Sequence, residues 1–315
     1  MQGDGPTGQS VLVTGGAGFI GSHLAEALIP DNDVTVLDDL SSGSRQAVPD
    51  EATFAHADVR EESVLAAQLE STDLVFHQAA NASVSQSVKN PIASHENNVD
   101  ATLQLLEGAR REDVRVVLAS SCAIYGHPET VPIPESEPTN PTSPYGLEKL
   151  TVDHYARLYH ELYGLETVVL RYFNVYGPRQ SGGNYSGVID VFLDQATGGG
   201  PLTVHGDGTQ TRDFVYVSDV VRANLAAAVT DQVGEAFNIG TGRSISIREL
   251  AELVRDSVET TVEIVHTDSR PGDVELSEAD VSKATNQLQF EPMVRIADGL
   301  DRVTGWYQSE ERTER

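Results

Sequence analysis

Short apolar runs alternate with longer stretches of helical periodicity up to about residue 175. The runs are rich in valine and leucine, as expected of strands that are buried on both faces. Between them, apolar residues recur every three or four positions, which is typical of helices packed on a sheet. This alternation predicts a doubly wound α/β fold with a parallel sheet. The predicted strands are 11–14, 34–37, 53–56, 74–77, 114–119 and 166–171, and the predicted helices are 22–28, 61–69, 91–111 and 142–163.

The pattern changes near residue 175. Beyond it, short elements are separated by polar loops, and the segment Gly198-Gly199-Gly200-Pro201 separates a helical stretch from a short strand. Such a texture is typical of a smaller cap that faces the carboxyl ends of parallel strands, where these sheets bind ligands. We therefore predict a first domain over 8–174, to which a segment near 212–240 returns, and a smaller cap made mainly of 175–315.

Three glycines follow the first predicted strand directly, and a helix begins after them. Gly15 can take a tight turn, Gly18 lets backbone N–H groups approach a pyrophosphate, and Gly21 lets the helix lie close to the strand. The second predicted strand ends at Asp38, about 20 residues further on, where a carboxylate typically binds the hydroxyls of an adenosine ribose. Asp38 and Asp39 would repel a 2′-phosphate, so the pattern predicts NAD rather than NADP.

Tyr145 and Lys149 are four residues apart in a predicted helix and share one face of it. An ammonium beside a phenol favours the phenolate, so we expect the pKa of Tyr145 to lie below its usual value of about 10. A phenol tuned in this way can act as a general base or acid. Ser121, at the end of the preceding strand, would hydrogen-bond the reacting hydroxyl of a substrate.

The formal net charge is −27 at pH 7, and the lysines are Lys89, Lys149 and Lys283. A surface this acidic repels nucleic acid and anionic membranes, so neither is expected as a main partner. The acids are spread along the whole chain, which favours a solvated acidic coat of the kind found in a high-salt cytoplasm, where salt screens the repulsion. The alternative is an acidic face that binds a basic protein.

The single cysteine, Cys122, excludes an internal disulfide and is typical of a reducing cytoplasm. No stretch reaches the roughly 18 apolar residues needed to span a bilayer. Residues 1–6 have neither the basic nor the apolar region of a signal peptide, so we expect a cytoplasmic protein. The nine histidines lack the spacing of metal ligands, and no metal site is predicted.

A set of motifs between about Val11 and Tyr307 resembles a known family. The motifs are T-G-G-A-G-F-I-G-S-H-L, L-D-D-L-S-S-G, H-Q-A-A, N-N-V, S-S-C-A-I-Y-G, S-P-Y-G-L-E-K, R-Y-F-N-V-Y-G-P-R, G-D-G-T-Q-T-R-D-F-V-Y-V-S-D-V and R-P-G-D-V. Together they resemble the extended short-chain dehydrogenases/reductases, and specifically the nucleotide-sugar epimerases of the UDP-glucose 4-epimerase type. The resemblance implies a Rossmann fold that holds NAD, a UDP-sugar substrate, and a homodimer built on helices 91–111 and 142–163.

The same resemblance implies a role for individual positions. The implied cofactor-binding residues are Gly15, Gly18, Phe19, Ile20 and Gly21 at the pyrophosphate, Asp38 and Asp39 at the adenosine ribose, Asp58 and Val59 at the adenine, and Ala79, Ala80, Asn98, Tyr145 and Lys149 further along the cofactor. The implied substrate-binding residues are Asn174, Arg212 and Arg270 at the diphosphate, Asp273 at the uridine ribose, and Ser121 and Ser277 at the sugar. Ser121, Tyr145 and Lys149 would form the reacting group.

The implied reaction transfers a hydride from C4 of the sugar to NAD and returns it to the opposite face of the 4-keto sugar. Related 4,6-dehydratases carry an Asp-Glu pair after the strand-end serine or threonine, and related decarboxylases usually carry a glutamate there. This chain has Cys122-Ala123, which favours epimerisation. In related epimerases, a tyrosine at the position of Ser277 excludes N-acetylated sugars, so the small serine would leave room for them.

Two alternatives stay open from the sequence. One is an epimerase for a uronic acid such as UDP-glucuronate, which would need a further cation beside the sugar. The other is a non-catalytic NAD-binding module. Such modules usually lose the tyrosine and lysine pair, whereas this chain retains Tyr145 and Lys149.

Overall fold

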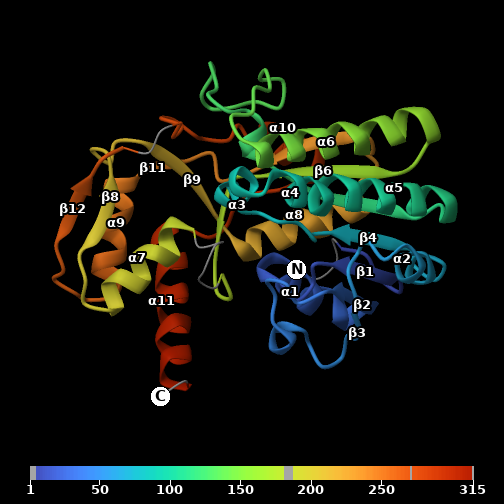
Figure 1. Ribbon diagram of the computed structural model, residues 1–315, viewed down its shortest axis with the longest axis horizontal. Coiled ribbons are helices and arrows are strands. Elements are labelled where there is room, and N and C mark those ends of the chain that lie inside the picture. The colour runs from blue at the N-terminus through green and yellow to red at the C-terminus, as the bar shows by residue number, and fades with distance from the viewer. Residues whose placement is uncertain (1–4, 181–186, 270–271, 314–315) are drawn as a thin grey trace.

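A seven-stranded sheet forms the centre of the molecule, as a computed structural model that describes residues 5–180, 187–269 and 272–313 shows (Figure 1). Its strands lie in the order β10-β6-β5-β4-β1-β2-β3, and every neighbouring pair is parallel. The predicted doubly wound parallel sheet is therefore confirmed. The strands are β1 (Ser10–Thr14), β2 (Asp33–Asp38), β3 (Thr53–His56), β4 (Leu74–His77), β5 (Arg115–Ser121), β6 (Thr167–Tyr172) and β10 (Glu235–Ile239).

Helices cover both faces of this sheet, which explains why its strands read as continuous apolar runs. All residues of β4 and β6 are buried. One face packs against α1 (Phe19–Leu28) and α8 (Val217–Val229), and α10 (Ser282–Leu288) packs beside α8. The other face packs against α2 (Glu62–Leu69), α5 (Ala101–Glu112) and α6 (Pro144–Tyr163).

The predicted helix over 91–111 is not a single α-helix. It consists of α4 (Pro91–His95), a π-helical turn η3 (Glu96–Asp100) and α5, and a short helix α3 (Val84–Lys89) precedes it. A π turn widens the helix by one residue, and such turns are frequently found at functional sites. Here the π turn places Asn97 in the lining of the cavity described below.

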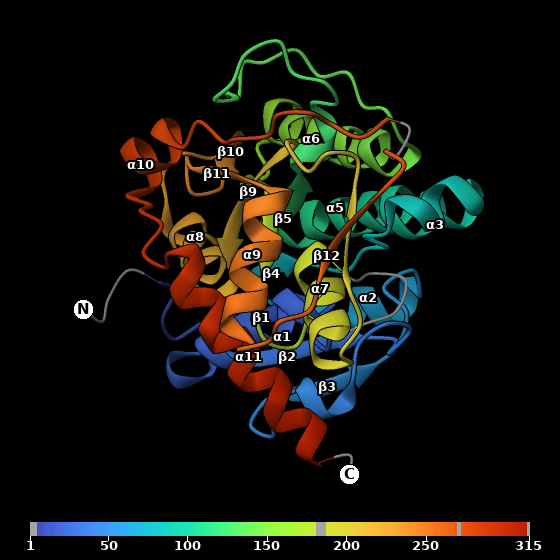
Figure 2. The same ribbon diagram turned by 90° about the vertical axis from the view of Figure 1, so that its left-hand side faces the viewer.

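The cap lies beside the sheet and has its own core (Figures 1 and 2). A three-stranded sheet in the order β11-β9-β7 leads from the central sheet into the cap, and a two-stranded sheet β12-β8 lies further out. The cap elements are β7 (Asn174–Tyr176), α7 (Val188–Thr197), β8 (Leu202–His205), β9 (Thr211–Tyr216), β11 (Ser244–Ser246), α9 (Ile247–Ser257), β12 (Ile264–Thr267) and α11 (Ile296–Thr313).

A buried carboxylate joins the cap to the long connection that follows β5. Asp213, on β9, is fully buried and accepts hydrogen bonds from the backbone N–H groups of Thr241, Gly242 and Ala279 and from the Thr241 hydroxyl. Ala279 in turn pairs with Ile133 in an isolated parallel bridge. The Asp213 side chain therefore holds two segments that are distant in the sequence, and through Ala279 it also positions the segment around Ile133.

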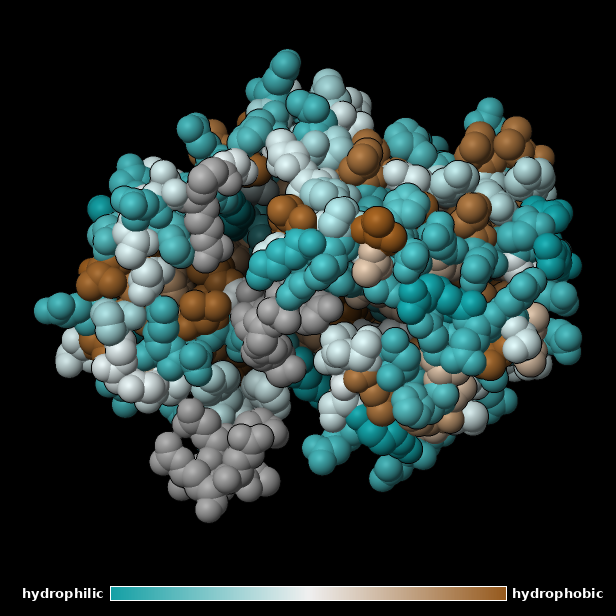
Figure 3. Space-filling view, viewed as in Figure 1, coloured by the Kyte–Doolittle hydropathy of each residue, from teal (hydrophilic) through white to brown (hydrophobic). Residues whose placement is uncertain are grey.

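The face of the molecule seen in Figure 3 carries separate apolar patches on a mainly hydrophilic background. Among the exposed large apolar residues, Leu147, Leu158 and Leu162 lie on α6, while Val88 and Ile92 lie on α3 and α4. No helix in the described part of the chain is sufficiently long and apolar to cross a membrane. Within the same residues, no cluster of three or more His, Cys, Asp or Glu side chains could hold a metal ion.

Candidate active site

A cavity of about 820 Å³ opens at the carboxyl ends of the central strands, where the cap faces the sheet. The strand order reverses between β1 and β4, and ligands of doubly wound sheets bind at this point. Side chains from the β1–α1 loop, from the ends of β2, β4 and β5, from α6 and from β7 line the cavity. The volume suits a dinucleotide together with part of a substrate.

The glycine loop after β1 forms one end of the cavity. Gly15 has a φ of +68°, and a Cβ atom at this position would lie 2.6 Å from the backbone nitrogen of Ala79. A Cβ atom at Gly21 would lie only 2.2 Å from the carbonyl oxygen of Gly15. Both positions therefore require glycine, and the loop leads straight into the N-terminus of α1, where a phosphate group is favoured. These residues fit the pyrophosphate of a dinucleotide.

Asp38 lies at the end of β2 and lines the cavity beside the glycine loop. Its Oδ2 accepts the N–H of Ala17 at 2.9 Å and its Oδ1 accepts the N–H of Leu40 at 2.8 Å. Burial raises the pKa of Asp38, and these backbone hydrogen bonds act in the opposite direction. Each oxygen has a second lone pair that can accept a hydroxyl of a ribose. Asp39 also lines the cavity.

Asp58 and Val59 line the same end of the cavity. The Asp58 carboxylate is engaged by Arg60, whose Nε lies 3.0 Å from both carboxylate oxygens. Hydrogen bonding to Arg60 lowers the pKa of Asp58. The Asp58 side chain is therefore held by Arg60. The backbone of Asp58 takes no part in this ion pair.

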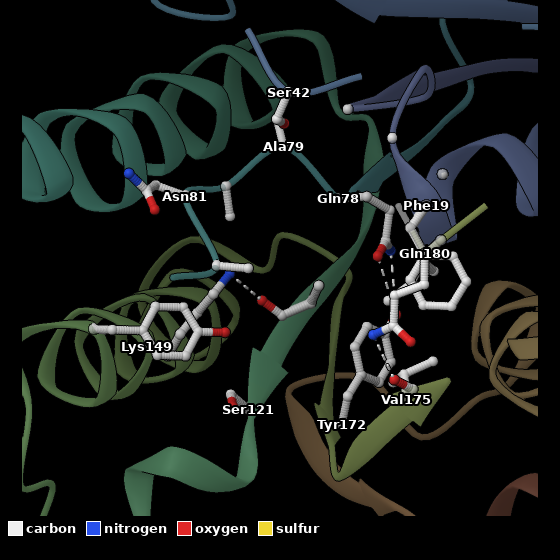
Figure 4. A pocket seen from close by; sticks show the side chains of 18 of the residues that line it. Phe19, Ser42, Gln78, Ala79, Asn81, Ser121, Lys149, Tyr172, Val175 and Gln180 are labelled. Atoms are coloured by element: carbon white, nitrogen blue, oxygen red, sulfur yellow. Dashed lines mark hydrogen bonds between the residues drawn. The ribbon is translucent and has the colours of Figure 1, made fainter. Parts of the chain in front are cut away.

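Tyr145, Lys149 and Ser121 come together at the opposite end, as their predicted helix and strand positions require. Tyr145 and Lys149 lie on α6, both buried, and Ser121 ends β5; all three line the cavity. Figure 4 shows Ser121 and Lys149 on the same side of the cavity, away from Gln78 and Tyr172. The Nζ atom of Lys149 donates a hydrogen bond to the backbone oxygen of Ala119 at 2.9 Å (Figure 4).

The prediction of a lowered pKa for Tyr145 is wrong for this structure. Burial raises the pKa of the phenol to about 12, because the loss of hydration destabilises the phenolate more than the neighbouring groups stabilise it. Hydrogen bonding to Ser121 opposes this rise. The Lys149 ammonium is engaged by the Ala119 carbonyl instead. Burial also lowers the pKa of Lys149 to about 8, while the adjacent Glu148 raises it.

Several cavity residues were missed by the sequence analysis. Gln78 and Asn81 follow β4, and the rule that strand ends carry ligand-binding residues could have identified them. Gln78 donates to the Tyr172 hydroxyl at 3.2 Å, and Tyr172 lines the cavity from β6 (Figure 4). Arg179 also lines the cavity and binds Glu26 on α1 at 2.9 Å.

The predicted residues divide into two groups by their position. The residues that line the cavity are Gly15, Gly18, Phe19, Ile20, Gly21, Asp38, Asp39, Asp58, Val59, Ala79, Ala80, Ser121, Tyr145, Lys149 and Asn174. Asn98 does not line it, because its side chain is buried against Asn81 and Glu148. Arg270 lies outside the described residues.

Three further predicted residues lie in the cap, outside the cavity lining. Arg212 forms an ion pair with Asp273 and also donates to the backbone oxygens of Thr211 and Val274. Ser277 is buried. The sequence placed Arg212 and Asp273 at different parts of one substrate, whereas the structure pairs their side chains with each other.

Comparison with known proteins gives consistent matches over nearly the whole chain. A UDP-glucose 4-epimerase of Mycolicibacterium smegmatis is 36% identical, and the match covers 95% of this chain and 98% of that protein. The solved structure of a Thermus thermophilus UDP-glucose 4-epimerase in complex with NAD has a TM-score of 0.89 and 37% identity, and covers 95% of this chain and 99% of that one.

A solved UDP-N-acetylglucosamine 4-epimerase from Methanobrevibacter ruminantium, in complex with UDP-N-acetylmuramic acid, has a TM-score of 0.93 and 38% identity. That match covers 97% of this chain and all of the other chain. Residues 11–240 match the model of the NAD dependent epimerase/dehydratase family. The glycine loop and the Asp38 carboxylate fit NAD, and the predicted resemblance is confirmed. With its fold, its cavity and these relatives in agreement, the chain belongs to the NAD-dependent epimerase/dehydratase family.

Proposed function

We propose that this protein is an isomerase that inverts C4 of a UDP-hexose and so interconverts UDP-glucose and UDP-galactose. The observation that carries the proposal is the joint presence of Tyr145, Ser121 and Lys149 in one cavity with the glycine loop and Asp38. The relatives named as UDP-glucose 4-epimerases support the same reaction. The chemistry that bound NAD supplies is the reversible acceptance of a hydride from a sugar carbon.

The side chains at the α6 end would handle the proton of the sugar hydroxyl. The Tyr145 oxygen removes the proton from the 4-hydroxyl in one half of the reaction and returns a proton in the other half. Ser121 donates a hydrogen bond to the same sugar oxygen. Because the phenol is buried with its pKa raised to about 12, it needs positive charge beside it before it can act as the base. Lys149, one helical turn away, supplies that charge in our proposal.

The remaining residues would hold the cofactor and the substrate. In our proposal, Gly15, Gly18 and Gly21 bind the pyrophosphate, and Asp38 with Asp39 bind the adenosine ribose. The cofactor contacts continue at Phe19, Ile20, Asp58, Val59, Ala79 and Ala80, with Asn98 behind them, and the substrate contacts are Asn174, Arg212, Arg270 and Asp273. Arg212 would have to exchange its ion pair with Asp273 for the diphosphate, whose oxygens suit the planar fork of a guanidinium.

A neutral sugar suits the cavity better than a uronic acid. Of the described residues that line it, Lys149 and Arg179 are the cations. Arg179 is already paired with Glu26, and Lys149 is assigned to the reacting group. A sugar carboxylate therefore finds no dedicated cation among these residues. Cys122 and Ala123 line the cavity at the end of β5, where elimination or decarboxylation would call for acidic side chains.

We propose that N-acetylated UDP-sugars are also accepted. The small Ser277 is buried in the cap outside the cavity lining, so the room it would leave for an acetamido group requires the cap segment that carries Asp273 to approach the sugar. A related solved structure is named as a UDP-N-acetylglucosamine 4-epimerase, which supports the same proposal.

One assay tests both the proposed 4-epimerisation and the proposed acceptance of N-acetylated sugars. Purified protein, without added NAD, is incubated separately with UDP-glucose, UDP-N-acetylglucosamine and UDP-glucuronate, and the products are separated by chromatography. We expect the 4-epimers of the first two and none from the third. Failure with all three would overturn the proposed reaction, and failure with the acetylated sugar alone would overturn only the wider specificity.

We further propose a homodimer that acts in a reducing, high-salt cytoplasm. Leu147, Leu158 and Leu162 leave apolar surface on α6, and Ile92 leaves more on α4, as expected of helices that pair with a second subunit. The single thiol and the net charge of −27 suit such a compartment. Light scattering coupled to size-exclusion chromatography gives the mass directly, and a monomer at micromolar concentration would contradict the dimer.

A further inference from the structure

Glu148 is a buried carboxylate between Tyr145 and Lys149 on α6, and the proposed chemistry does not use it. Its exposed fraction is 4%. A single oxygen of this carboxylate, Oε2, accepts hydrogen bonds from Asn98 Nδ2 at 2.6 Å and from Ser94 Oγ at 2.7 Å. A buried charge is costly without such bonds, so an acid at this position calls for a structural or functional reason.

The contacts of Glu148 continue to the wall of the cavity. Asn98 Oδ1 accepts the N–H of Asn81 at 2.7 Å, and Asn98 Nδ2 donates to the carbonyl oxygen of Asn81 at 3.1 Å. A carboxylate can only accept hydrogen bonds, so it requires the Asn98 amide to present its nitrogen to α6 and its oxygen to the N–H of Asn81. Asn81 lines the cavity on the same side as Lys149 (Figure 4).

We propose that Glu148 is a positioning residue of this active site. Through Asn98 it clamps the cavity wall at Asn81 to helix α6, and its negative charge serves as the counter-charge of the Lys149 ammonium. The clamp fixes the distance between the wall segment that contacts the cofactor and the helix that carries Tyr145. The effect on turnover rests on the proposed epimerase function, whereas the effect on cofactor retention does not.

Two titratable groups at the strands beside Lys149, His77 and Cys122, are neutral near pH 7. On β4, burial lowers the pKa of His77 to about 3, and its two ring nitrogens contact Thr14 and Thr102. At the end of β5, burial raises the pKa of Cys122 to about 11.

Two further groups on α6 complete the surroundings of Lys149. The pKa of Tyr145 is raised to about 12, so its phenol is also neutral near pH 7. Asp153, one turn further along α6, has its carboxylate engaged by Arg171 and Arg157. The adjacent Glu148 is thus the group whose charge raises the pKa of Lys149 against the effect of burial, and its loss should make the Lys149 proton easier to remove.

Two substitutions separate the clamp from the charge. In Glu148→Gln the amide oxygen can still accept both hydrogen bonds, so the clamp stays and only the charge is lost. In Glu148→Ala both are lost. Glu161→Gln is the matched control, because Glu161 is an exposed acid on the same helix. Circular dichroism establishes that each variant is folded.

The readouts are the pH profile of kcat with UDP-glucose and the rate at which bound NAD leaves the protein. We expect Glu148→Gln to retain NAD as the wild type does and to move the alkaline limb of the profile to lower pH by about one unit. We expect Glu148→Ala to shift the limb in the same way and to release NAD at least about tenfold faster, and Glu161→Gln to match the wild type in both.

The counter-charge and the clamp can each be overturned separately. An unchanged alkaline limb in Glu148→Gln would overturn the counter-charge, and wild-type NAD release from Glu148→Ala would overturn the clamp. If Glu148→Ala does not fold, a moved limb in Glu148→Gln still supports the counter-charge and an unmoved one overturns it. A wild-type protein without turnover would overturn the proposed function alone, because NAD release still tests the clamp.

Discussion

The Lys149 ammonium donates to the backbone oxygen of Ala119 at 2.9 Å, so one side chain ties helix α6 to the end of strand β5. The acceptor is a neutral carbonyl, which stabilises the ammonium less than a carboxylate would. Burial therefore dominates and lowers the pKa of Lys149 to about 8. The protonation of this residue changes within the range in which enzymes are assayed.

The first prediction concerns this titration. A lowered pKa means that Lys149 is charged below about pH 8 and loses its proton above it, at a lower pH than an exposed lysine does. We expect kcat to fall as the pH rises from 7 to 9, because the charge that favours the phenolate is lost. This fall is measured as kcat against pH in overlapping buffers. A kcat that stays constant up to pH 9 would contradict the role of the Lys149 charge in favouring the phenolate.

The second prediction concerns the proton carrier. Tyr145→Phe removes the hydroxyl and leaves the buried ring in place, so we expect turnover to fall by about 10³-fold or more. The fold and the bound NAD should be retained, because the substitution leaves the glycine loop and Asp38, which hold the cofactor in our proposal, unchanged. Turnover is measured by chromatography of UDP-sugars, and NAD by its release on denaturation. Retained turnover would exclude Tyr145 as the base.

The third prediction concerns the glycine loop. In Gly21→Ala the new Cβ atom would lie 2.2 Å from the Gly15 oxygen, so α1 must move away from β1. We expect loss of bound NAD and a lower melting temperature. The control is Gly305→Ala on α11, where a Cβ atom meets nothing within 4 Å; it should be neutral or slightly stabilising. Equal losses in both variants would contradict the steric argument.

The fourth prediction concerns a buried ion pair below the cavity. Asp153 is fully buried and binds Arg171 through Oδ2 at 2.7 Å. Asp153→Ala leaves the buried guanidinium without its partner, which costs about 3 to 5 kcal/mol of unfolding free energy. Urea unfolding measures the loss. Glu107→Gln, which removes the more exposed pair with Arg110, should change the stability little.

The fifth prediction concerns salt. With a net charge of −27, acidic groups repel each other across the folded surface, and this repulsion is screened at high ionic strength. We expect the melting temperature to rise when KCl is raised from about 0.1 M, where the Debye length is about 10 Å, to about 1 M, where it is about 3 Å. An equal osmolality of sucrose serves as the control for solvent exclusion. No difference between salt and sucrose would exclude charge screening.

The sequence was a good guide wherever local spacing carries the chemistry. Three glycines followed by Asp38 placed one end of the cavity, because strand, loop and helix are contiguous there. The four-residue spacing of Tyr145 and Lys149 placed both on one helix face, since the periodicity of a helix is fixed. The glycine loop with Asp38, and the pair of Tyr145 and Lys149, could both be located without knowledge of the tertiary contacts.

The features that depend on long-range contacts could not be predicted in this way. The ion pair of Arg212 with Asp273 forms because β9 meets a cap segment that follows β12, and nothing local indicates that meeting. The raised pKa of Tyr145 follows from the completed burial of the phenol, which outweighs the nearby lysine. The π turn at 96–100 has the same helical periodicity as its neighbours, so the sequence predicted one continuous helix there.

The carboxylate of Asp213 has a consequence for protein engineering. It holds Thr241, Gly242 and Ala279 together, and Ala279 also touches the connection that precedes α6 through Ile133. A chimera that takes its N-terminal half from one relative and its cap from another would cut through this junction. Recombination partners should therefore be chosen with the residues around Asp213 inherited from a single parent.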